Sequence, residues 1–282
     1  MPTEAFLAVI AAALMHAGWN ALVKGRSGSD PLSSSVAIAT GAAVVALPCL
    51  LVTGLPGKAS TWFIVASIGL HITYFTLMGL SYRAADYSVA YPLTRGTAPL
   101  GTAILGVIIV GEPLQPLAWL GIALLSFGVV ALGSEGLLRK GLTLQGLGFV
   151  VLNIANVVAY TLVDGMGARL AGNAVAYVML MHLLTGICLV PLALAVRGPV
   201  VLADMRARAG LSLMAGAMVL AAYSTVMWAM TKAPIALVGA LREISVLFAT
   251  ILAAVLLGER FGPVRWLASV AVVVGLVAIR LA

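Results

Sequence analysis

The sequence predicts an all-α membrane protein with ten transmembrane helices, arranged as two inverted repeats of five helices. Three observations predict this fold class. Charged residues make up only 9% of the 282 residues and hydrophobic residues make up 62%, whereas soluble domains carry about 25% charged residues. Apolar runs of about 20 residues, the length that crosses a bilayer, follow one another along the chain. Motifs of the first half recur in the second half.

The composition excludes several classes of protein. So few charges cannot coat a soluble domain, and a disordered chain has the opposite composition. The net charge of +7 and the pI near 9.8 would fit nucleic-acid binding, but the basic residues are scattered through short connectors, as in membrane proteins that orient by cytoplasmic Lys and Arg. We therefore expect no nucleic-acid partner. The N-terminus lacks the basic region of a signal peptide, so we expect the first apolar run to be a retained span.

Apolar runs bounded by Gly, Pro and charged residues predict the spans. The longest polar connectors between them are 134–143 and 197–209, and the others are tight turns. The ten predicted spans are 5–23, 33–53, 61–81, 87–110, 115–133, 144–163, 174–196, 210–231, 235–257 and 264–281.

The two halves of the chain repeat one another. Segment 111–120 reads GEPLQPLAWL and segment 258–267 reads GERFGPVRWL, so Gly, Glu, Pro, Trp and Leu recur at an offset of 147. The same offset places Arg95 on Arg242. We therefore predict two five-helix units, 1–140 and 141–282. Because five is odd, the second unit enters the membrane upside down, which is typical of transporters whose site lies near the midplane between the repeats.

Each unit ends in a small-residue-rich span, a Gly-Glu turn, a Pro-x-x-Trp-Leu start and a Gly-containing last span. This pattern resembles the EamA repeat of the drug/metabolite transporter superfamily, present twice, and it is clearest at 82–133 and 229–281. The segments 90–97 and 240–245 are similar to one bacterial branch of that superfamily. The resemblance implies a multi-pass protein of the bacterial inner membrane that moves small metabolites, including amino acids, or in other branches drugs or nucleotide sugars.

Three ionisable residues lie well inside predicted spans, namely Arg95, Arg242 and Glu243. An ionised group at the bilayer centre costs at least about 2.5–3.5 kcal/mol on insertion scales, so such residues are candidates for substrate binding or coupling. The alternative is an ion pair that only fixes helix packing. Arg242 and Glu243 are adjacent in sequence, so we expect them to point in different directions. Glu243 is free to pair with Arg95 across the two halves.

Two prolines flank Arg95 in the fourth span. Pro92 and Pro99 have no N–H, so each removes one helical hydrogen bond, and Pro99 leaves the carbonyl of Arg95 without its partner. A broken helix that carries a charge is typical of transporter binding sites. The sequence therefore predicts a helix break at Arg95, with a kink for packing as the alternative.

Polar stripes mark the first and sixth spans. His16, Asn20 and Lys24 are spaced i, i+4 and i+8, so they share one helix face, with Trp19 beside them. The sixth span carries a counterpart stripe, and Tyr91 shares the face of Arg95. We expect His71 and His182 to be structural. The predicted substrate-binding residues are Arg95, Arg242, Glu243, Tyr91, His16, Trp19, Asn20, Asn156 and Tyr160, and the counterpart stripe is Asn153, Asn156, Tyr160 and Asp164.

These residues favour an alternating-access carrier of a small polar metabolite, and we expect it to be an exporter. Two arginines suit a carboxylate or phosph(on)ate group, since guanidinium binds both bidentately, and Glu243 would meet an ammonium group or carry a coupling proton. An amino acid or an organic anion fits, and a proton or a counter-substrate is a possible second partner. The alternatives are a multidrug or cationic-compound exporter and, less favoured, a channel.

We expect no enzyme, metal or cofactor, because the chain has no His-Glu-x-x-His motif and no cysteine cluster. A membrane enzyme requires a nucleophile with its base or a metal cluster. Small-residue faces around Gly121, Gly128 and Gly275 let helices approach closely. They fit either packing between the halves of a monomer or the seam of a homodimer.

The orientation is our first testable prediction. Connectors after odd-numbered spans hold ten Lys and Arg residues, and the termini with the other connectors hold four. Cytoplasmic loops carry the excess, so we expect both termini outside the cytoplasm, although the resemblance implies termini inside. Fusions after Ala282 should show activity of a phosphatase that folds only outside. Fluorescence of a protein that matures only inside would contradict this orientation.

Overall fold

The computed structural model is all-helical. It describes residues 1–24, 31–134, 142–257 and 262–282, and no strand occurs among them. The helices are α1 (Thr3–Lys24), α2 (Pro31–Thr53), η1 (Lys58–Ser60), α3 (Thr61–Ala84), α4 (Tyr87–Leu105), the π-helix η2 (Gly106–Val110), α5 (Pro116–Leu132), α7 (Leu144–Leu170), α8 (Ala174–Arg197), α9 (Val200–Ala207), α10 (Ala209–Met230), α11 (Ile235–Arg242), α12 (Ile244–Leu257) and α13 (Pro263–Leu281).

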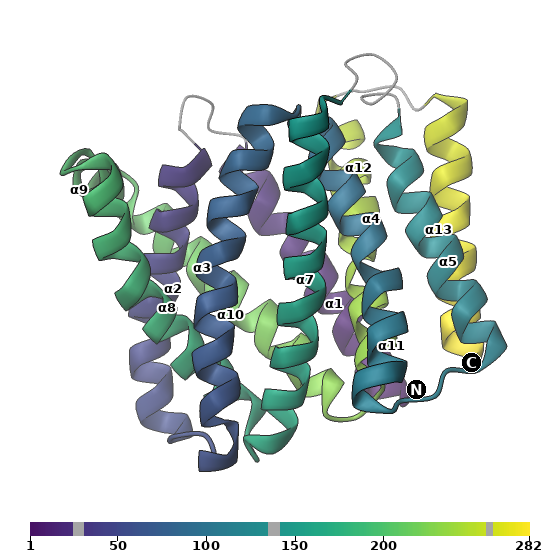
Figure 1. Cartoon of the computed structure of the whole chain (residues 1–282), viewed down its shortest axis with the longest axis horizontal. Coiled ribbons are helices and arrows are strands. Elements are labelled where there is room, and N and C mark those ends of the chain that lie inside the picture. Colours follow the sequence, from purple (N-terminus) through teal and green to yellow (C-terminus); the bar gives the residue numbers. More distant parts are fainter. Residues whose placement is uncertain (25–30, 135–141, 258–261) are drawn as a thin grey trace.

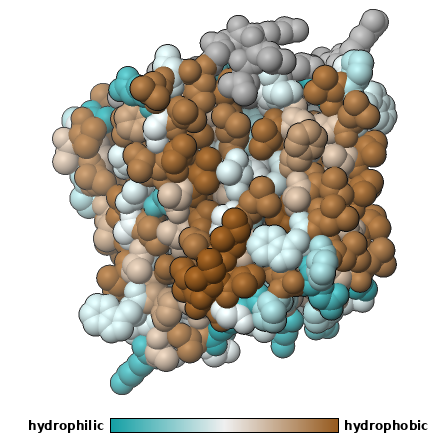
Figure 2. Space-filling view, turned by 45° about the vertical axis from the view of Figure 1, so that its right-hand side comes forward, coloured by the Kyte–Doolittle hydropathy of each residue, from teal (hydrophilic) through white to brown (hydrophobic). Residues whose placement is uncertain are grey.

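Within the described residues, eight helical segments are long and apolar enough to cross a membrane. They coincide with eight of the ten predicted spans. The other two predicted spans, 5–23 and 115–133, also form helices, but α1 is not among the eight and α5 is a shorter apolar helix. Large apolar side chains such as Leu51 and Val52 are exposed along the helices. Figure 2 shows hydrophobic residues over most of the visible face and hydrophilic residues mainly toward its ends. The chain is therefore a membrane protein.

The helices run roughly side by side and the two chain ends lie at the same end of the bundle (Figure 1). The guanidinium of Arg280 ties them together, because Nη1 donates to the carbonyl of Met1 at 3.2 Å and Nη2 donates to the hydroxyl of Thr3 at 2.8 Å.

Two predicted boundaries are wrong. The connector 197–209 contains a helix, α9. The sixth span continues beyond 163, because α7 runs to Leu170 and includes Asp164 and Arg169. The predicted span ended before the first charged residue. In the structure, Asp164 and Arg169 both continue the helix because residues of other segments pair with them. The predicted connector 134–143 lies mostly outside the described residues, and the turn 258–260 lies wholly outside them.

Small residues bring α5 and α13 together. A Cβ atom added at Gly121 would lie 2.8 Å from the carbonyl oxygen of Gly275, and one added at Gly275 would lie 2.7 Å from that of Gly121. A Cβ at Gly128 would meet the carbonyl oxygen of Ala268 at 2.7 Å. The small-residue faces thus serve packing between the two halves of one chain.

This contact gives a second prediction. Gly275→Ala should lower the free energy of unfolding by about 1–3 kcal/mol, the usual cost of overpacking. Gly148→Ala on α7 is the matched control, since a Cβ there meets nothing within 4 Å and alanine favours helix. Melting temperatures in detergent should fall for Gly275→Ala and hold or rise for Gly148→Ala. Equal melting temperatures would show that α5 and α13 do not need their close approach.

Candidate functional site

A helix break in the second half positions the central charges. The helix that starts at Ile235 ends at Arg242, and α12 begins at Ile244, so Glu243 is the residue between them. The N–H of Glu243 donates to the carbonyl of Ala240 at 3.0 Å, three residues earlier, as in a tightened last turn. The surrounding backbone is buried. This break therefore sits inside the bundle, where it places two charged side chains.

Arg95, Arg242 and Glu243 form one buried cluster. The three residues are 6%, 7% and 1% exposed. Arg95 Nε lies 2.7 Å from Glu243 Oε2, and Arg242 Nε lies 3.7 Å from Glu243 Oε1. The expected pair of Arg95 with Glu243 across the two halves is therefore present. The expectation that Arg242 and Glu243 point apart is wrong, because the break at Glu243 interrupts the regular helical spacing on which it rested.

The cluster has unused hydrogen-bonding capacity. Among the described residues, Nε and Nη2 of Arg95, Nε of Arg242 and Oε2 of Glu243 are buried without a hydrogen-bond partner. Arg95 Nε and Glu243 Oε2 are close enough for an ion pair, but they are not aligned for a hydrogen bond. Buried donors of this kind are costly unless something binds them. Two guanidiniums against one carboxylate leave one positive charge in excess.

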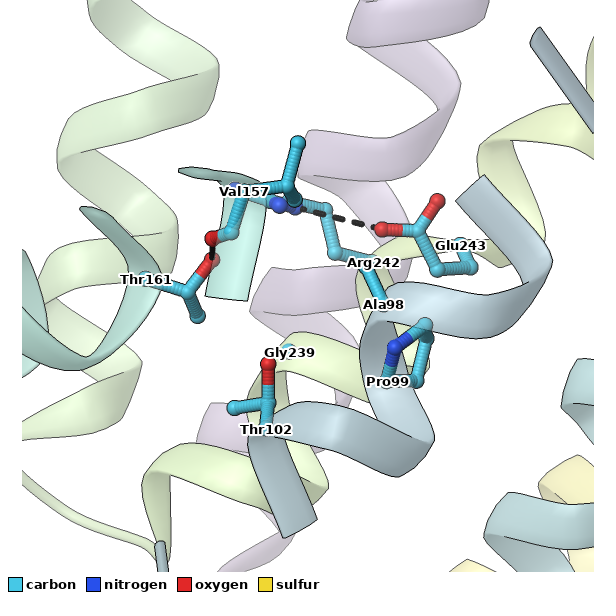
Figure 3. A pocket seen from close by; sticks show the side chains of 8 residues that line it. All are labelled: Ala98, Pro99, Thr102, Val157, Thr161, Gly239, Arg242 and Glu243. Carbon is cyan, nitrogen blue, oxygen red and sulfur yellow. Dashed lines mark hydrogen bonds and ion pairs between the residues drawn. The ribbon is translucent and has the colours of Figure 1, made fainter. Parts of the chain in front are cut away.

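A small pocket opens beside these charges (Figure 3). The space between its lining atoms, open solvent included, is about 180 Å³. Side chains from α4, α7 and α11 line it together with Glu243, which places the pocket between the two halves. The lining residues are Ala98, Pro99, Thr102, Val157, Thr161, Gly239, Arg242 and Glu243.

The aromatic candidates lie around the cluster. Arg242 Cζ stands 5.9 Å from the centre of the Tyr160 ring, a cation–π distance. Tyr91 is close enough to Arg95, Arg242 and Glu243 for their charges to act on it. His16 is likewise within reach of both guanidiniums. The structure thus brings these three predicted residues to the charges.

The remaining candidates have other partners. Trp19 Nε1 donates to His16 Nδ1 at 3.4 Å, and the amide of Asn20 donates to the His16 carbonyl at 2.8 Å. The amide of Asn156 donates to the carbonyl of Leu70 on α3 at 3.1 Å. These hydrogen bonds therefore orient His16 or join helices. The side chain of Lys24, the last residue of the first stripe, lies outside what the structure describes.

The predicted helix break at Arg95 is wrong. α4 is continuous through Pro92 and Pro99, and the break lies in the second half, at Glu243. Each proline removes only one hydrogen bond, which membrane helices tolerate when neighbouring groups compensate. The first half departs from a regular α-helix about two turns after Pro99, in the π-helix η2.

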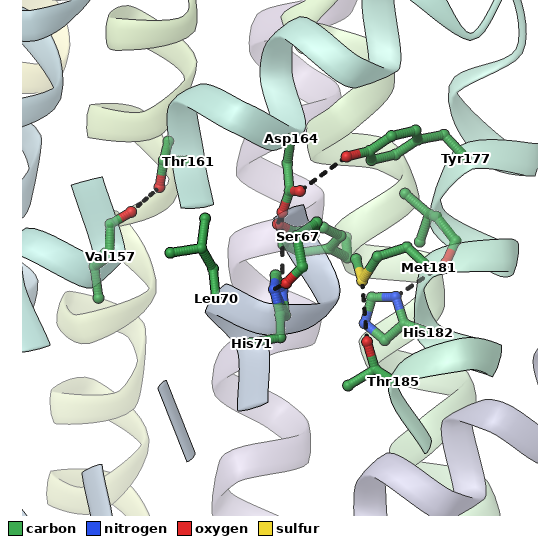
Figure 4. A network of polar contacts seen from close by, with 12 residues as sticks. Ser67, Leu70, His71, Val157, Thr161, Asp164, Tyr177, Met181, His182 and Thr185 are labelled. Atoms are coloured by element: carbon green, nitrogen blue, oxygen red, sulfur yellow. Dashed lines mark hydrogen bonds and ion pairs between the residues drawn. The ribbon is translucent and has the colours of Figure 1, made fainter. Parts of the chain in front are cut away.

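Asp164, one residue beyond the predicted end of the sixth span, forms a second buried polar cluster (Figure 4). It is 0% exposed. Tyr177 donates to its Oδ1 at 3.0 Å, Tyr223 donates to its Oδ2, and His71 Nε2 lies 3.8 Å from Oδ2. The stripe of Asn153, Asn156, Tyr160 and Asp164 was the signal that could have placed Asp164 in α7.

A third polar cluster joins the halves at the end that holds the termini. Arg169 Nη2 lies 2.5 Å from Glu112 Oε1, and the N–H of Ile235, the first residue of α11, donates to Glu112 Oε2 at 2.8 Å. The guanidinium of Arg169 also donates to the carbonyls of Met230 and Ala233 at 2.7 and 2.9 Å. We call these contacts the Glu112–Arg169 latch. The recurring Gly-Glu motif marked one partner, whereas Arg169 was assigned to a connector.

Comparison with known proteins identifies the second half. The model of the EamA-like transporter family matches residues 145–281. This match is consistent with an EamA-type transporter. A solved structure, described only as the crystal structure of a protein, has the same fold with a TM-score of 0.79, at 19% identity over 100% of this chain and 99% of its own. At this identity the likeness concerns the fold alone. No curated protein matches the sequence.

The third prediction concerns the buried ion pair of Arg95 and Glu243. Glu243→Gln leaves two guanidiniums buried without their counter-charge, so it should lower the free energy of unfolding by about 3–5 kcal/mol. Adding Arg95→Met to Glu243→Gln should recover part of that loss, because it removes one unpaired charge. A double-mutant cycle on unfolding in detergent measures the coupling. Additive effects would show that the two side chains do not interact.

Proposed function

We propose that the chain is an alternating-access exporter in a bacterial inner membrane, and that its substrate is a small metabolite with a carboxylate or phosph(on)ate group. The observation that carries the proposal is the pair of buried guanidiniums with unfilled donors beside a pocket between the halves. Guanidinium binds such oxyanions bidentately. An oxyanion would also balance the excess positive charge of the cluster.

Glu243 narrows the proposed substrate class. A zwitterionic amino acid presents both a carboxylate and an ammonium group, so it matches the two arginines and the carboxylate together. Binding would let Arg95 turn from Glu243 to the substrate while Glu243 takes the ammonium. A cationic drug would find Glu243 already held by two guanidiniums, which disfavours a multidrug exporter.

The proposed mechanism uses two units, 1–140 and 141–282, as inverted repeats in ten spans. Arg95 comes from the first unit, and Arg242 and Glu243 come from the second, so the central charges join the two units. The Glu112–Arg169 latch also crosses between them and lies at one end of the bundle. Alternating access would open that end by breaking the latch. A channel would lack such a closed end, and the packing of α5 on α13 within one chain favours a monomer.

Ligand binding is the direct test. Purified protein is screened by thermal shift against amino acids, organic acids and phosph(on)ates, because a ligand that binds only the folded state stabilises it by about 2.7 kcal/mol at 100 times its Kd. A hit should carry an oxyanion. Stabilisation by hydrophobic cations alone would favour the multidrug alternative.

The fourth prediction concerns Arg95. Arg95→Lys keeps the charge but loses the planar fork that grips an oxyanion with two bonds. We expect most transport of the screened ligand by proteoliposomes to be lost while the melting temperature falls little. Arg280→Lys, at the chain ends and away from the cluster, is the matched control and should transport normally. Near-normal transport by Arg95→Lys would leave Arg95 with a charge role only.

A further inference from the structure

The Asp164 cluster has the composition of a proton site. It is separate from the cluster of Arg95, Arg242 and Glu243, which we call the arginine cluster. Four helices meet there, since Asp164 comes from α7, His71 from α3, Tyr177 and His182 from α8, and Tyr223 from α10. The His71 ring lies 6.1 Å from that of His182 and 5.9 Å from that of Tyr223. Among the described residues, no group of His, Cys, Asp and Glu suits a metal ion.

Hydrogen bonds fix which nitrogen of each histidine carries hydrogen. His71 Nδ1 faces the carbonyl of Ser67 at 3.2 Å, and His182 Nδ1 faces the carbonyl of Val178 at 3.0 Å. A carbonyl oxygen only accepts, so each Nδ1 must be the donor. In a neutral ring Nε2 then holds a lone pair. The lone pair of His71 Nε2 therefore stands opposite Asp164 Oδ2, 3.8 Å away.

Two acceptors that face each other in a buried site need a proton between them. With one proton the pair of Asp164 and His71 has no net charge, either as two neutral groups or as carboxylate and imidazolium. Without it, a bare carboxylate is left in the bundle interior, at 0% exposure, which is costly. Tyr177 and Tyr223 stabilise a carboxylate by donating to both oxygens, so both states have partners.

Among the described residues, no other ionisable group supplies a permanent positive charge in contact with Asp164 that would remove the need for the proton. From α8, Tyr177 and His182 face Asp164, and from α10, Tyr223 does. The fixed positive charge on this side is Arg242 of α11, which acts on His71 from beyond Tyr160. On α4, Arg95 and Tyr91 lie with Glu243 instead. Within this part of the structure, Asp164 therefore has no permanent cation in ion-pair contact.

We propose that Asp164 and His71 form a proton-binding site, separate from the arginine cluster, where one proton is taken up and released in each transport cycle. This rests on the proposed transport function. The proton joins Asp164 Oδ2, which then faces the lone pair of His71 Nε2, and leaves from the same oxygen, with no other bond changed. Tyr160 connects the two sites, because its ring lies 4.9 Å from that of His71 and 5.9 Å from Arg242 Cζ. Glu243, flanked by two guanidiniums, keeps its charge.

Infrared spectroscopy tests the proton site without any substrate. Reconstituted protein is titrated with acid, and the carbonyl stretch of a protonated carboxylic acid is followed. We expect a band in the wild type that is lost in Asp164→Asn and kept in Glu243→Gln. Tyr223→Phe, which removes one donor and keeps the carboxyl, should shift the frequency of the band. A band that survives Asp164→Asn, that is lost in Glu243→Gln protein which still shows a cooperative melting transition, or that is absent at every pH would overturn the proposal.

Transport separates this proposal from the proposed function. Proteoliposomes are assayed with a mixture of radiolabelled amino acids, once for exchange at equal pH and once for accumulation driven by a pH gradient. Asp164→Asn should lose gradient-driven accumulation and keep exchange, whereas unchanged accumulation overturns the proton site. If the wild type takes up no amino acid, an amino acid is not the substrate, and the infrared result still decides whether Asp164 binds a proton.

Discussion

Charge compensation inside an apolar bundle is the constraint on which the rest of this structure depends. A charged side chain in the membrane interior is costly unless it is paired or reaches water. Each of the three polar clusters satisfies this requirement in a different way. Arg95 and Arg242 share the carboxylate of Glu243, Asp164 has tyrosine donors and a histidine, and Arg169 has Glu112 with backbone carbonyls. In each cluster the partners come from different segments of the chain, so the pairing also fixes the arrangement of the bundle.

The sequence predicted most of the fold because hydropathy is a local property. An apolar run of span length is visible in the composition of a short stretch of sequence. Eight of the described helical segments are long and apolar enough to cross a membrane. Arg95, Arg242 and Glu243 were also predictable, since a charge in the middle of an apolar run stands out. Asp164 was predicted only as part of a polar stripe, because it lies one residue beyond the predicted span 144–163. Its partners are Tyr177 and Tyr223, whose approach depends on tertiary packing.

The position of the helix break was not predictable from local signals. Proline is the usual marker, but α4 stays continuous through Pro92 and Pro99, while α11 ends at Arg242 without a proline at the break. At Glu243 the break is compatible with tertiary charge pairing, because the carboxylate then reaches Arg95 across the two halves. A backbone that departs from helical geometry near a buried charge is tolerated in membranes only where other groups or a cavity satisfy it. The pocket lined by Gly239, Arg242 and Glu243 is such a place.

Helix α7 links the three clusters to one another. It carries Tyr160 against Arg242, Asp164 four residues later and Arg169 in its last turn. A rigid helix of 27 residues moves as a unit, so a change of charge at Asp164 would act on both the central cluster and the latch. Asp164 lies between the other two residues along α7, one helical turn from the first and just over one turn from the second. In the proposed transport cycle, a proton on Asp164 would therefore connect substrate binding with opening of the latched end through α7 alone.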